Sequence, residues 1–188
     1  MKKIMFNDKY GLTKAVLDGS KTMTRRIVPQ TTIDKYALLE DNTIIDDARY
    51  DIGEVVAVAQ SYKELEYDNL GLDRSPKDWR IVRGTLGQSK GWDNKMFVRA
   101  EACKHHILIT DISVERLQDI SEDDCLKEGI WRANNVGLKG TTYWYHSLVN
   151  SSFRTPQEAY ASLIDRISGK GTWASNPYVF VYEFELSD

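Results

Sequence analysis

The chain has 188 residues, a length that suits one domain or one domain carrying insertions. Hydrophobic residues make up 41% and charged residues 28%, so the chain has the composition of a globular protein with enough apolar mass for a core. The formal net charge of -3 argues against a general duplex-DNA-binding protein with a basic surface, but it leaves room for a local basic pocket.

The cysteines and the N-terminus indicate the compartment. Cys103 and Cys125 are far apart and form no CxxC pair, so we expect no disulfide and take a reducing cytoplasm as the default. The first residues, "MKKIMFNDKYG", contain no long apolar run, which predicts neither a signal peptide nor a membrane span. We therefore expect a cytoplasmic protein.

The first helix is predicted over 8–18, with Asn7 or Asp8 as its N-cap. Gly19 stands where a helix-ending glycine belongs. The segment "RIV" before Pro29 then indicates a short strand.

The segment "LDGSKTMTRRIVP" between these two elements concentrates cations and hydroxyls. On a regular strand Lys21 and Thr24 would point to opposite faces, so they meet only if the backbone turns tightly near Gly19. One interpretation is a solvated loop whose charges keep the protein soluble. The other is a pocket wall in which Lys21, Thr24, Arg25 and Arg26 face a phosphate or a base edge.

The middle of the chain predicts strands separated by a long excursion. "DIGEVVAVA", residues 51–59, indicates a turn followed by a buried strand, because its apolar run is continuous. Residues 63–94 show no periodicity and are interpreted as an excursion from the core. "MFVRAEA" and "HHILITDISVERL" then alternate as strands do, with a phase slip before Ile112 that suggests a bulge.

A short helix follows in "ISEDDCLKEG". Ser121 with Asp124 forms a capping box, and Gly129 closes the helix. Glu128 lies at the C-terminal end, where the helix dipole disfavours a carboxylate, which hints that Glu128 serves another purpose. The alternative is an exposed glutamate that costs only a few tenths of a kcal/mol.

The last third of the chain predicts an insertion, a helix and a strand. The aromatic run in 131–150 is either a platform for a base or a satellite packing cluster. "RTPQEAYASLIDRI" predicts a helix capped by Thr155 and Glu158, and "YVFVYEFEL" predicts a final strand. Strands outnumber helices, so we predict an α+β fold: a small mixed, mainly antiparallel β-barrel with helices packed outside.

Metal binding is not expected. Cys103 and His105 would share one face of a strand, but two ligands are too few for zinc, and only His146 remains to join them. We therefore expect neither a metal site nor a cofactor.

Four segments together resemble the ASCH domain family, a branch of the PUA-like barrels: "DGSKTMTRR", "YDIGEVVAV", "ITDISVERLQDISEDDCLKEGI" and "YVFVYEFEL". The run "GKGTWASNPYVFVYEFE" is similar to the larger ASCH proteins that phages and prophages often encode. The resemblance implies a single ASCH domain over 1–188 with insertions at about 63–94 and 131–150, and a cleft for RNA or a nucleoside.

Some small family members are amidohydrolases that deacetylate N4-acetylcytidine without a metal, and one relative is reported as a ribonuclease. The resemblance carries their lysine and threonine over to Lys21 and Thr24 of "KTMT", and their glutamate to Glu128. Thr24 would attack the acetyl carbonyl, Lys21 would take its proton, and Glu128 would orient or protonate the leaving amine. Lys21 must then be neutral part of the time, which burial beside two arginines would favour.

A second class of function uses the same cleft for binding. Lys21, Arg25 and Arg26 would hold a phosphate, and a base would stack on Tyr62 or a tryptophan. In a ribonuclease variant Lys21 would stabilise the phosphorane charge. The expected partner in every case is RNA or a modified nucleoside, with no membrane and no duplex DNA.

Overall fold

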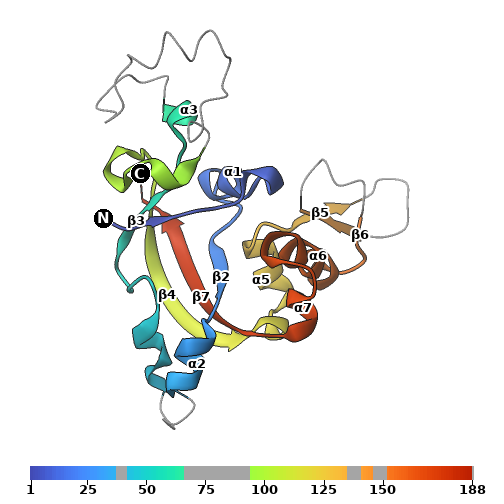
Figure 1. The fold of residues 1–188 in the computed structure, drawn as a ribbon. Coiled ribbons are helices and arrows are strands. Elements are labelled where there is room, and N and C mark those ends of the chain that lie inside the picture. Colours follow the sequence, from blue (N-terminus) through green and yellow to red (C-terminus); the bar gives the residue numbers. More distant parts are fainter. Residues whose placement is uncertain (37–41, 66–93, 135–140, 146–151, 188) are drawn as a thin grey trace. The chain divides into compact units, whose positions relative to one another are not determined.

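A computed structural model describes residues 1–36, 42–65, 94–134, 141–145 and 152–187 (Figure 1). The chain forms two compact units. The first comprises Met1–Phe6, Val55–Ile107 and Ser187–Asp188, and the second comprises Asn7–Glu54 and Leu108–Leu186.

The first unit is built on two short parallel strands, β1 (Lys3–Ile4) and β3 (Val55–Val58). Helix α3 (Tyr62–Leu65) follows β3, and 3₁₀ turns lie at Lys95–Phe97 and Ala100–Ala102. Residues of these elements share a small apolar core: Ala57, Tyr62, Leu65, Val98, Ala100 and Cys103.

The strand predicted over 96–102 is wrong, because this segment forms the two 3₁₀ turns. The Asn94 side chain accepts a hydrogen bond from the Met96 N–H and starts the first turn. The Lys3 ammonium donates to the carbonyls of Lys95, Met96 and Val98. Carbonyls that converge on one cation cannot alternate along a strand ladder.

The second unit begins with two short helices instead of the single helix predicted over 8–18. A 3₁₀ helix, Asp8–Tyr10, ends at Gly11, whose φ of 69° is left-handed, and α1 (Leu12–Leu17) starts there. Gly19 has a φ of 75° and ends this region, as predicted. Helix α2 (Gln30–Tyr36) and a 3₁₀ helix, Asn42–Asp47, come later.

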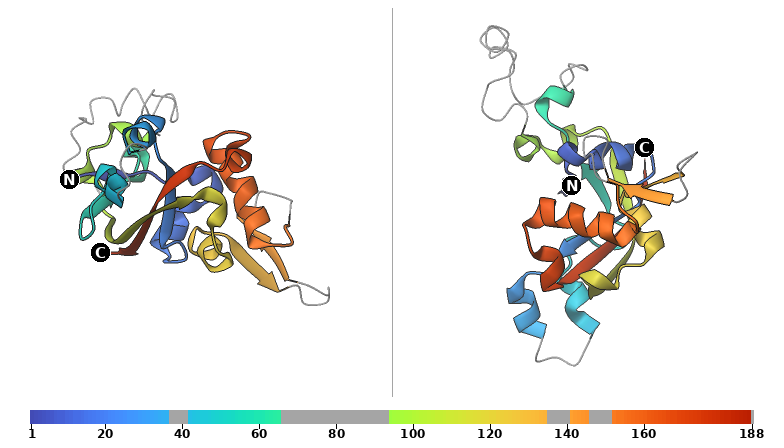
Figure 2. Two further views of the ribbon diagram at one scale, coloured as in Figure 1. Left: turned by 90° about the horizontal axis from the view of Figure 1, so that it is seen from below. Right: turned by 90° about the vertical axis from the view of Figure 1, so that its right-hand side faces the viewer.

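Three strands form the sheet of the second unit, in the order β4, β7, β2 (Figures 1 and 2). They span His106–Arg116, Tyr178–Leu186 and Met23–Ile27 respectively. β2 runs antiparallel to β7 with Thr24 opposite Tyr182. The prediction that the last strand pairs within the sheet is confirmed. Its residues from Val179 to Tyr182 are all buried, which shows that both faces of the sheet are covered along this part of the strand.

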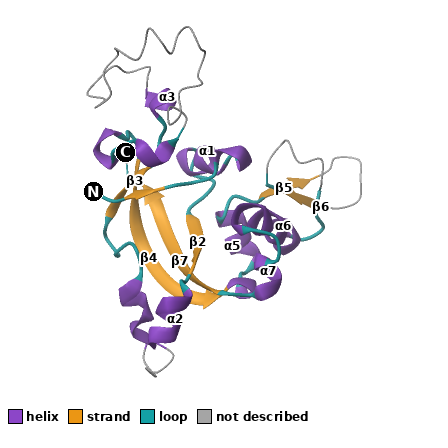
Figure 3. Ribbon diagram, in the orientation of Figure 1, coloured by secondary structure: helices purple, strands orange, loops and turns teal. Residues whose placement is uncertain are grey.

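Helices of the second unit gather beside β2 (Figure 3). They are α5 (Glu122–Lys127), α6 (Pro156–Ser168) and α7 (Thr172–Ser175). The Thr155 hydroxyl caps α6 by accepting from the Glu158 N–H at 3.1 Å, as predicted. A 3₁₀ turn, Leu117–Asp119, precedes α5, and β5 (Trp131–Asn134) pairs antiparallel with β6 (Thr141–Trp144).

The fold is therefore mixed α+β with a mostly antiparallel sheet and helices, but the barrel is not confirmed. Over the described ranges β1 pairs only with β3, and β2 pairs only with β7. Both are edge strands, and a closed barrel has no edges. The single domain with insertions stays a prediction, and most of the 63–94 insertion lies outside the described residues.

The two cysteines are free, buried thiols. In the part of the chain that the structure describes, no helix is both long and apolar enough to span a bilayer.

Candidate functional site

The site begins at the turn that brings Lys21 between two helices. Gly19 takes a left-handed conformation, which an L-residue avoids, and lets the chain reverse after α1. The Lys21 N–H donates to the Ala15 carbonyl at 2.8 Å, and the Thr22 N–H donates to the Lys127 carbonyl at 3.0 Å. The turn is thus anchored to α1 on one side and to α5 on the other.

The Lys21 ammonium is buried against Glu128. It donates to Glu128 Oε2 at 2.6 Å, to the Glu128 carbonyl at 2.8 Å and to the Met23 carbonyl at 2.6 Å. The Lys21 side chain is 2% exposed and that of Glu128 5%. Burial lowers the pKa of Lys21 below 10.5, and although Glu128 opposes this effect, the charges of Arg26 and Arg25 add to it.

Glu128 is positioned by the end of α5, where it is the C-cap residue. The Ser121 hydroxyl starts this helix by accepting from the Asp124 N–H at 3.0 Å, and Gly129 leaves it with a φ of 96°. A carboxylate at a helix C-terminus is electrostatically disfavoured, but this one faces two buried cations. The alternative of an exposed glutamate is therefore wrong.

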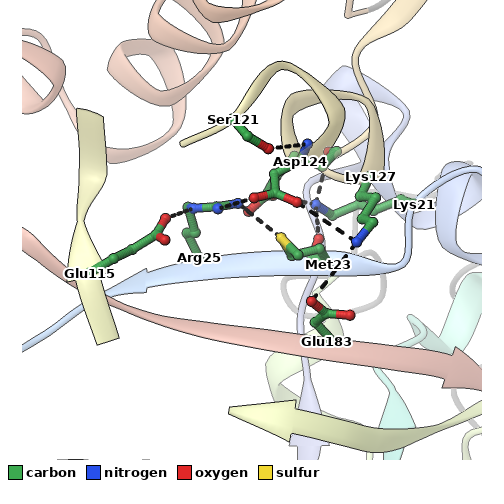
Figure 4. Close-up of polar contacts among 9 residues, drawn as sticks. Lys21, Met23, Arg25, Glu115, Ser121, Asp124, Lys127 and Glu183 are labelled. Atoms are coloured by element: carbon green, nitrogen blue, oxygen red, sulfur yellow. Dashed lines mark hydrogen bonds and ion pairs between the residues drawn. The ribbon is translucent and has the colours of Figure 1, made fainter. Parts of the chain in front are cut away.

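Arg25 lies inside the same network (Figure 4). Its guanidinium pairs with Glu115 Oε1 at 2.7 Å, Asp124 Oδ2 at 3.3 Å and Glu128 Oε1 at 3.3 Å. Burial lowers the pKa of Arg25, but Glu128 and Glu115 outweigh burial and raise it above the ordinary value. The Arg25 side chain is 0% exposed, so it is not a rim residue that a substrate could meet.

Thr24 lies on the opposite face of β2 from Met23 and Arg25, because strand side chains alternate. It is buried, and it faces Tyr182 across the ladder. Among the described residues its hydroxyl makes no hydrogen bond. The Met23 carbonyl that accepts from Lys21 belongs to the peptide bond joining Met23 to Thr24, so the ammonium lies against the backbone of Thr24.

The remaining predicted binding residues differ in their surroundings. Arg26 is half-buried on the Thr24 face of β2. Tyr62 belongs to the first unit, where it is 1% exposed in the apolar core and donates to the Phe97 carbonyl at 3.2 Å. A ring enclosed in this way offers no face to a base. The prediction that a base stacks on Tyr62 is therefore wrong.

Three residues of the network were not predicted from the sequence. They are Glu115, Asp124 and Tyr160. Asp124 and Glu128 are four residues apart and therefore share a helix face, which is a signal the sequence does carry. Tyr160 is a buried residue of α6 whose pKa is raised well above 10.0 by burial and by Glu128. Tyr160 lies near the ion pairs because of how α6 packs in the folded unit, and the spacing of residues in the sequence does not predict this packing.

No group of three His, Cys, Asp or Glu that could hold a metal ion occurs in the described ranges. His146, which completes the set weighed from the sequence, lies outside them. The three carboxylates of this network, Glu115, Asp124 and Glu128, each pair with Lys21 or Arg25.

Comparison with known proteins gives one structural neighbour. No family model matches the chain, and no curated protein matches it significantly. Among solved structures, an ASCH domain from Lactobacillus crispatus JV V101 is similar, with 13% sequence identity and a TM-score of 0.41. The similarity covers 95% of this chain and 72% of that one. The neighbour is itself an ASCH domain, the family that the sequence resembles.

Proposed function

We propose that this chain is an ASCH-type protein that binds RNA or a nucleoside, and that Lys21, Thr24 and Glu128 form a metal-independent amidohydrolase site for N4-acetylcytidine or a related modified base. One observation carries the proposal: the buried 2.6 Å pair of Lys21 and Glu128 lies against the backbone of Thr24. A buried lysine with a lowered pKa is the kind of group that can take a proton from a nucleophile.

The pair can supply both a base and an acid. Moving one proton from the Lys21 ammonium to the Glu128 carboxylate would give a neutral amine and a carboxylic acid without changing the net charge. Burial makes this neutral form more accessible, because it removes the hydration that favours the ion pair. The hydrogen bond at 2.6 Å provides the path for the proton.

The reaction would then proceed in two stages. The Thr24 hydroxyl oxygen attacks the acetyl carbon while Lys21 takes the hydroxyl proton. The bond from the acetyl carbon to N4 breaks, and N4 receives a proton from the Lys21–Glu128 pair. Water, deprotonated by the same pair, releases acetate from the Thr24 ester and restores the hydroxyl.

Arg25 has a positioning role in this proposal. Its bond to Glu128 Oε1 leaves Oε2 directed at Lys21. Its further bonds to Glu115 and Asp124 tie the guanidinium to β4 and α5. The arginine therefore fixes the carboxylate and does not touch the ligand.

The test is turnover of N4-acetylcytidine in the presence of a metal chelator, followed by chromatography. Wild type should release cytidine and acetate. Thr24→Val, which keeps the shape and removes the hydroxyl, should release none, whereas Thr24→Ser should retain part of the activity. Absence of cytidine after long incubation with concentrated wild-type enzyme would reject hydrolysis of this substrate.

A second candidate function is RNA binding without hydrolysis of the amide, including a ribonuclease that uses the same cleft. The half-buried Arg26 favours this candidate, because it lies on the Thr24 face, where a phosphate could reach it. A labelled single-stranded RNA that is bound but intact would support binding alone. Cleavage of the RNA that Lys21→Met abolishes would support the ribonuclease.

A further inference from the structure

Arg116 and Tyr178 form a stacked pair on the second unit, where β4 ends and β7 begins beside α7 (Figure 1). The central carbon of the Arg116 guanidinium lies over the Tyr178 ring, 3.7 Å from its centre, so the two planar groups are stacked. The guanidinium Nη1 also donates to the Asn176 carbonyl at 3.2 Å. An exposed side chain is thus held in one place by a ring and a carbonyl.

The segment that carries Tyr178 is tied to the end of β4. Asn176 has a φ of 46°, a left-handed conformation that asparagine adopts more readily than most residues. Its side-chain Oδ1 accepts from the Gln118 N–H at 2.8 Å, and the Leu117 N–H donates to the Pro177 carbonyl at 2.9 Å. The stacked pair is therefore preorganised, which lowers the entropy cost of binding a ligand.

Arg116 has no carboxylate partner among the described residues. Its contacts there are the Asn176 carbonyl and the Tyr178 ring. Acidic residues outnumber lysine and arginine in the second unit, and the neighbouring Glu115 pairs with Arg25. A guanidinium has five N–H donors and two faces, so Arg116 can offer its other donors and its outer face to a ligand.

The stacked pair lies on the same face of the sheet as Thr24. Side chains alternate along a strand, and Glu115, which precedes the stacked arginine, contacts Arg25 on the opposite face. Tyr178 and Tyr182 are four residues apart on β7 and share a face, and Tyr182 is opposite Thr24. Four residues of a strand span about 13 Å. A ligand that touches both places must therefore extend beyond a single nucleoside.

We propose that Arg116, stacked on Tyr178, binds an unpaired nucleotide of RNA whose base stacks on the outer face of the guanidinium. The inference rests on the proposed function and specifies its ligand as an RNA strand that extends beyond the reaction centre. Unpaired bases stack on guanidinium planes, and the remaining N–H groups can donate to the adjoining phosphate. Every base has a planar face, so this site should accept any of the four bases.

The test measures the affinity of the full chain for a labelled single-stranded RNA by fluorescence anisotropy. Arg116→Lys keeps the charge but removes the plane, so binding should weaken at least about fivefold, the loss expected for one stacked base. Arg116→Gln should weaken it at least as much. Arg154→Lys, the same change at an exposed arginine elsewhere, should bind as wild type does.

A duplex of the same sequence separates stacking from simple attraction to phosphates. Wild type should bind the single strand more tightly than the duplex, because paired bases cannot stack on the guanidinium. Arg116→Lys should reduce this preference, which a purely structural role of Arg116 would not do. Melting temperatures equal to that of wild type show that the variants are folded.

The outcomes separate this site from the proposed reaction. RNA that wild type does not bind, equal RNA affinity in wild type and both Arg116 variants, or equal affinity for duplex and single strand would each overturn the stacking site. Turnover of N4-acetylcytidine by wild type would still support the reaction in these cases. Conversely, no turnover together with RNA affinity that depends on Arg116 would reject the reaction and support the stacking site.

Discussion

At the scale of single residues, Lys21 and Glu128 form an ion pair whose burial is costly. Removing two charges from water costs several kcal/mol for each ion, and the pair recovers this only through close contacts. Lys21 makes three such contacts, and Glu128 has both Lys21 and Arg25 as partners. Such an arrangement is a poor device for stability alone, because an apolar pair would serve as well.

The lowered pKa of Lys21 predicts a pH dependence of stability. Between its folded pKa and 10.5, the value for an ordinary lysine, the unfolded chain binds more protons than the folded protein. The contribution of Lys21 to the free energy of unfolding should therefore rise with pH across this window. Urea unfolding of wild type and Lys21→Met over a pH series measures it. A constant difference between the two proteins would contradict the prediction.

Replacing Arg25 should greatly lower the free energy of unfolding. Arg25→Met removes one cation from three carboxylates and leaves Glu128 buried with a single partner, which should cost about 3 to 5 kcal/mol. Arg154→Met, a change at an exposed arginine, should stay within about 0.5 kcal/mol. Denaturant unfolding compares the two. Similar values for both variants would show that the Arg25 network is not structural.

At the scale of elements, the end of α5 determines where Glu128 points. Gly129 takes a φ of 96°, and a Cβ added there would lie 3.4 Å from Leu12 Cδ2 and 3.7 Å from Lys21 Cδ. The glycine therefore gives the backbone a conformation that other residues avoid, and an added Cβ would meet its neighbours only at ordinary van der Waals distances.

Gly129→Ala should lose about 1 to 2 kcal/mol from the backbone conformation, and because Gly129 directly follows Glu128, relief of this strain should also displace the Glu128 carboxylate. Gly53→Ala is the matched control, because Gly53 has a φ of 81° and nothing within 4 Å of the added atom. Both variants should lose stability, but only Gly129→Ala should also lose turnover or ligand affinity. Equal effects on function would show that the backbone at the end of α5 does not control the position of Glu128.

The elements also show what the sequence could and could not predict. The predictions of helix caps at Ser121 and Thr155 and of the final strand are confirmed, because these features depend on residues close together in the sequence. The strand over 96–102 failed because its carbonyls bind Lys3, a residue more than 90 positions away in the chain. The prediction that Arg25 contacts a substrate failed for the same reason. A segment rich in cations does not reveal which carboxylates the fold brings next to it.

At the scale of the whole molecule, the candidate site belongs to the second unit alone. Residues from Asn7–Glu54 supply Lys21, Thr24 and Arg25, and those from Leu108–Leu186 supply Glu115 and Glu128. These two stretches are far apart in the chain, so the site exists only when the unit is folded. The overall net charge of -3 is compatible with a cationic site, because Lys21, Arg25 and Arg26 are gathered in one short segment.

The central claim is that Lys21 and Thr24 act together in one reaction, and a double-mutant comparison of turnover tests it most directly. Initial rates of cytidine release from N4-acetylcytidine are measured for wild type, Lys21→Met, Thr24→Val and the double variant. Base and nucleophile that act as a unit give losses that do not add. The double variant should be no slower than the slower single variant. Losses that multiply, or a wild type without turnover, would contradict the account.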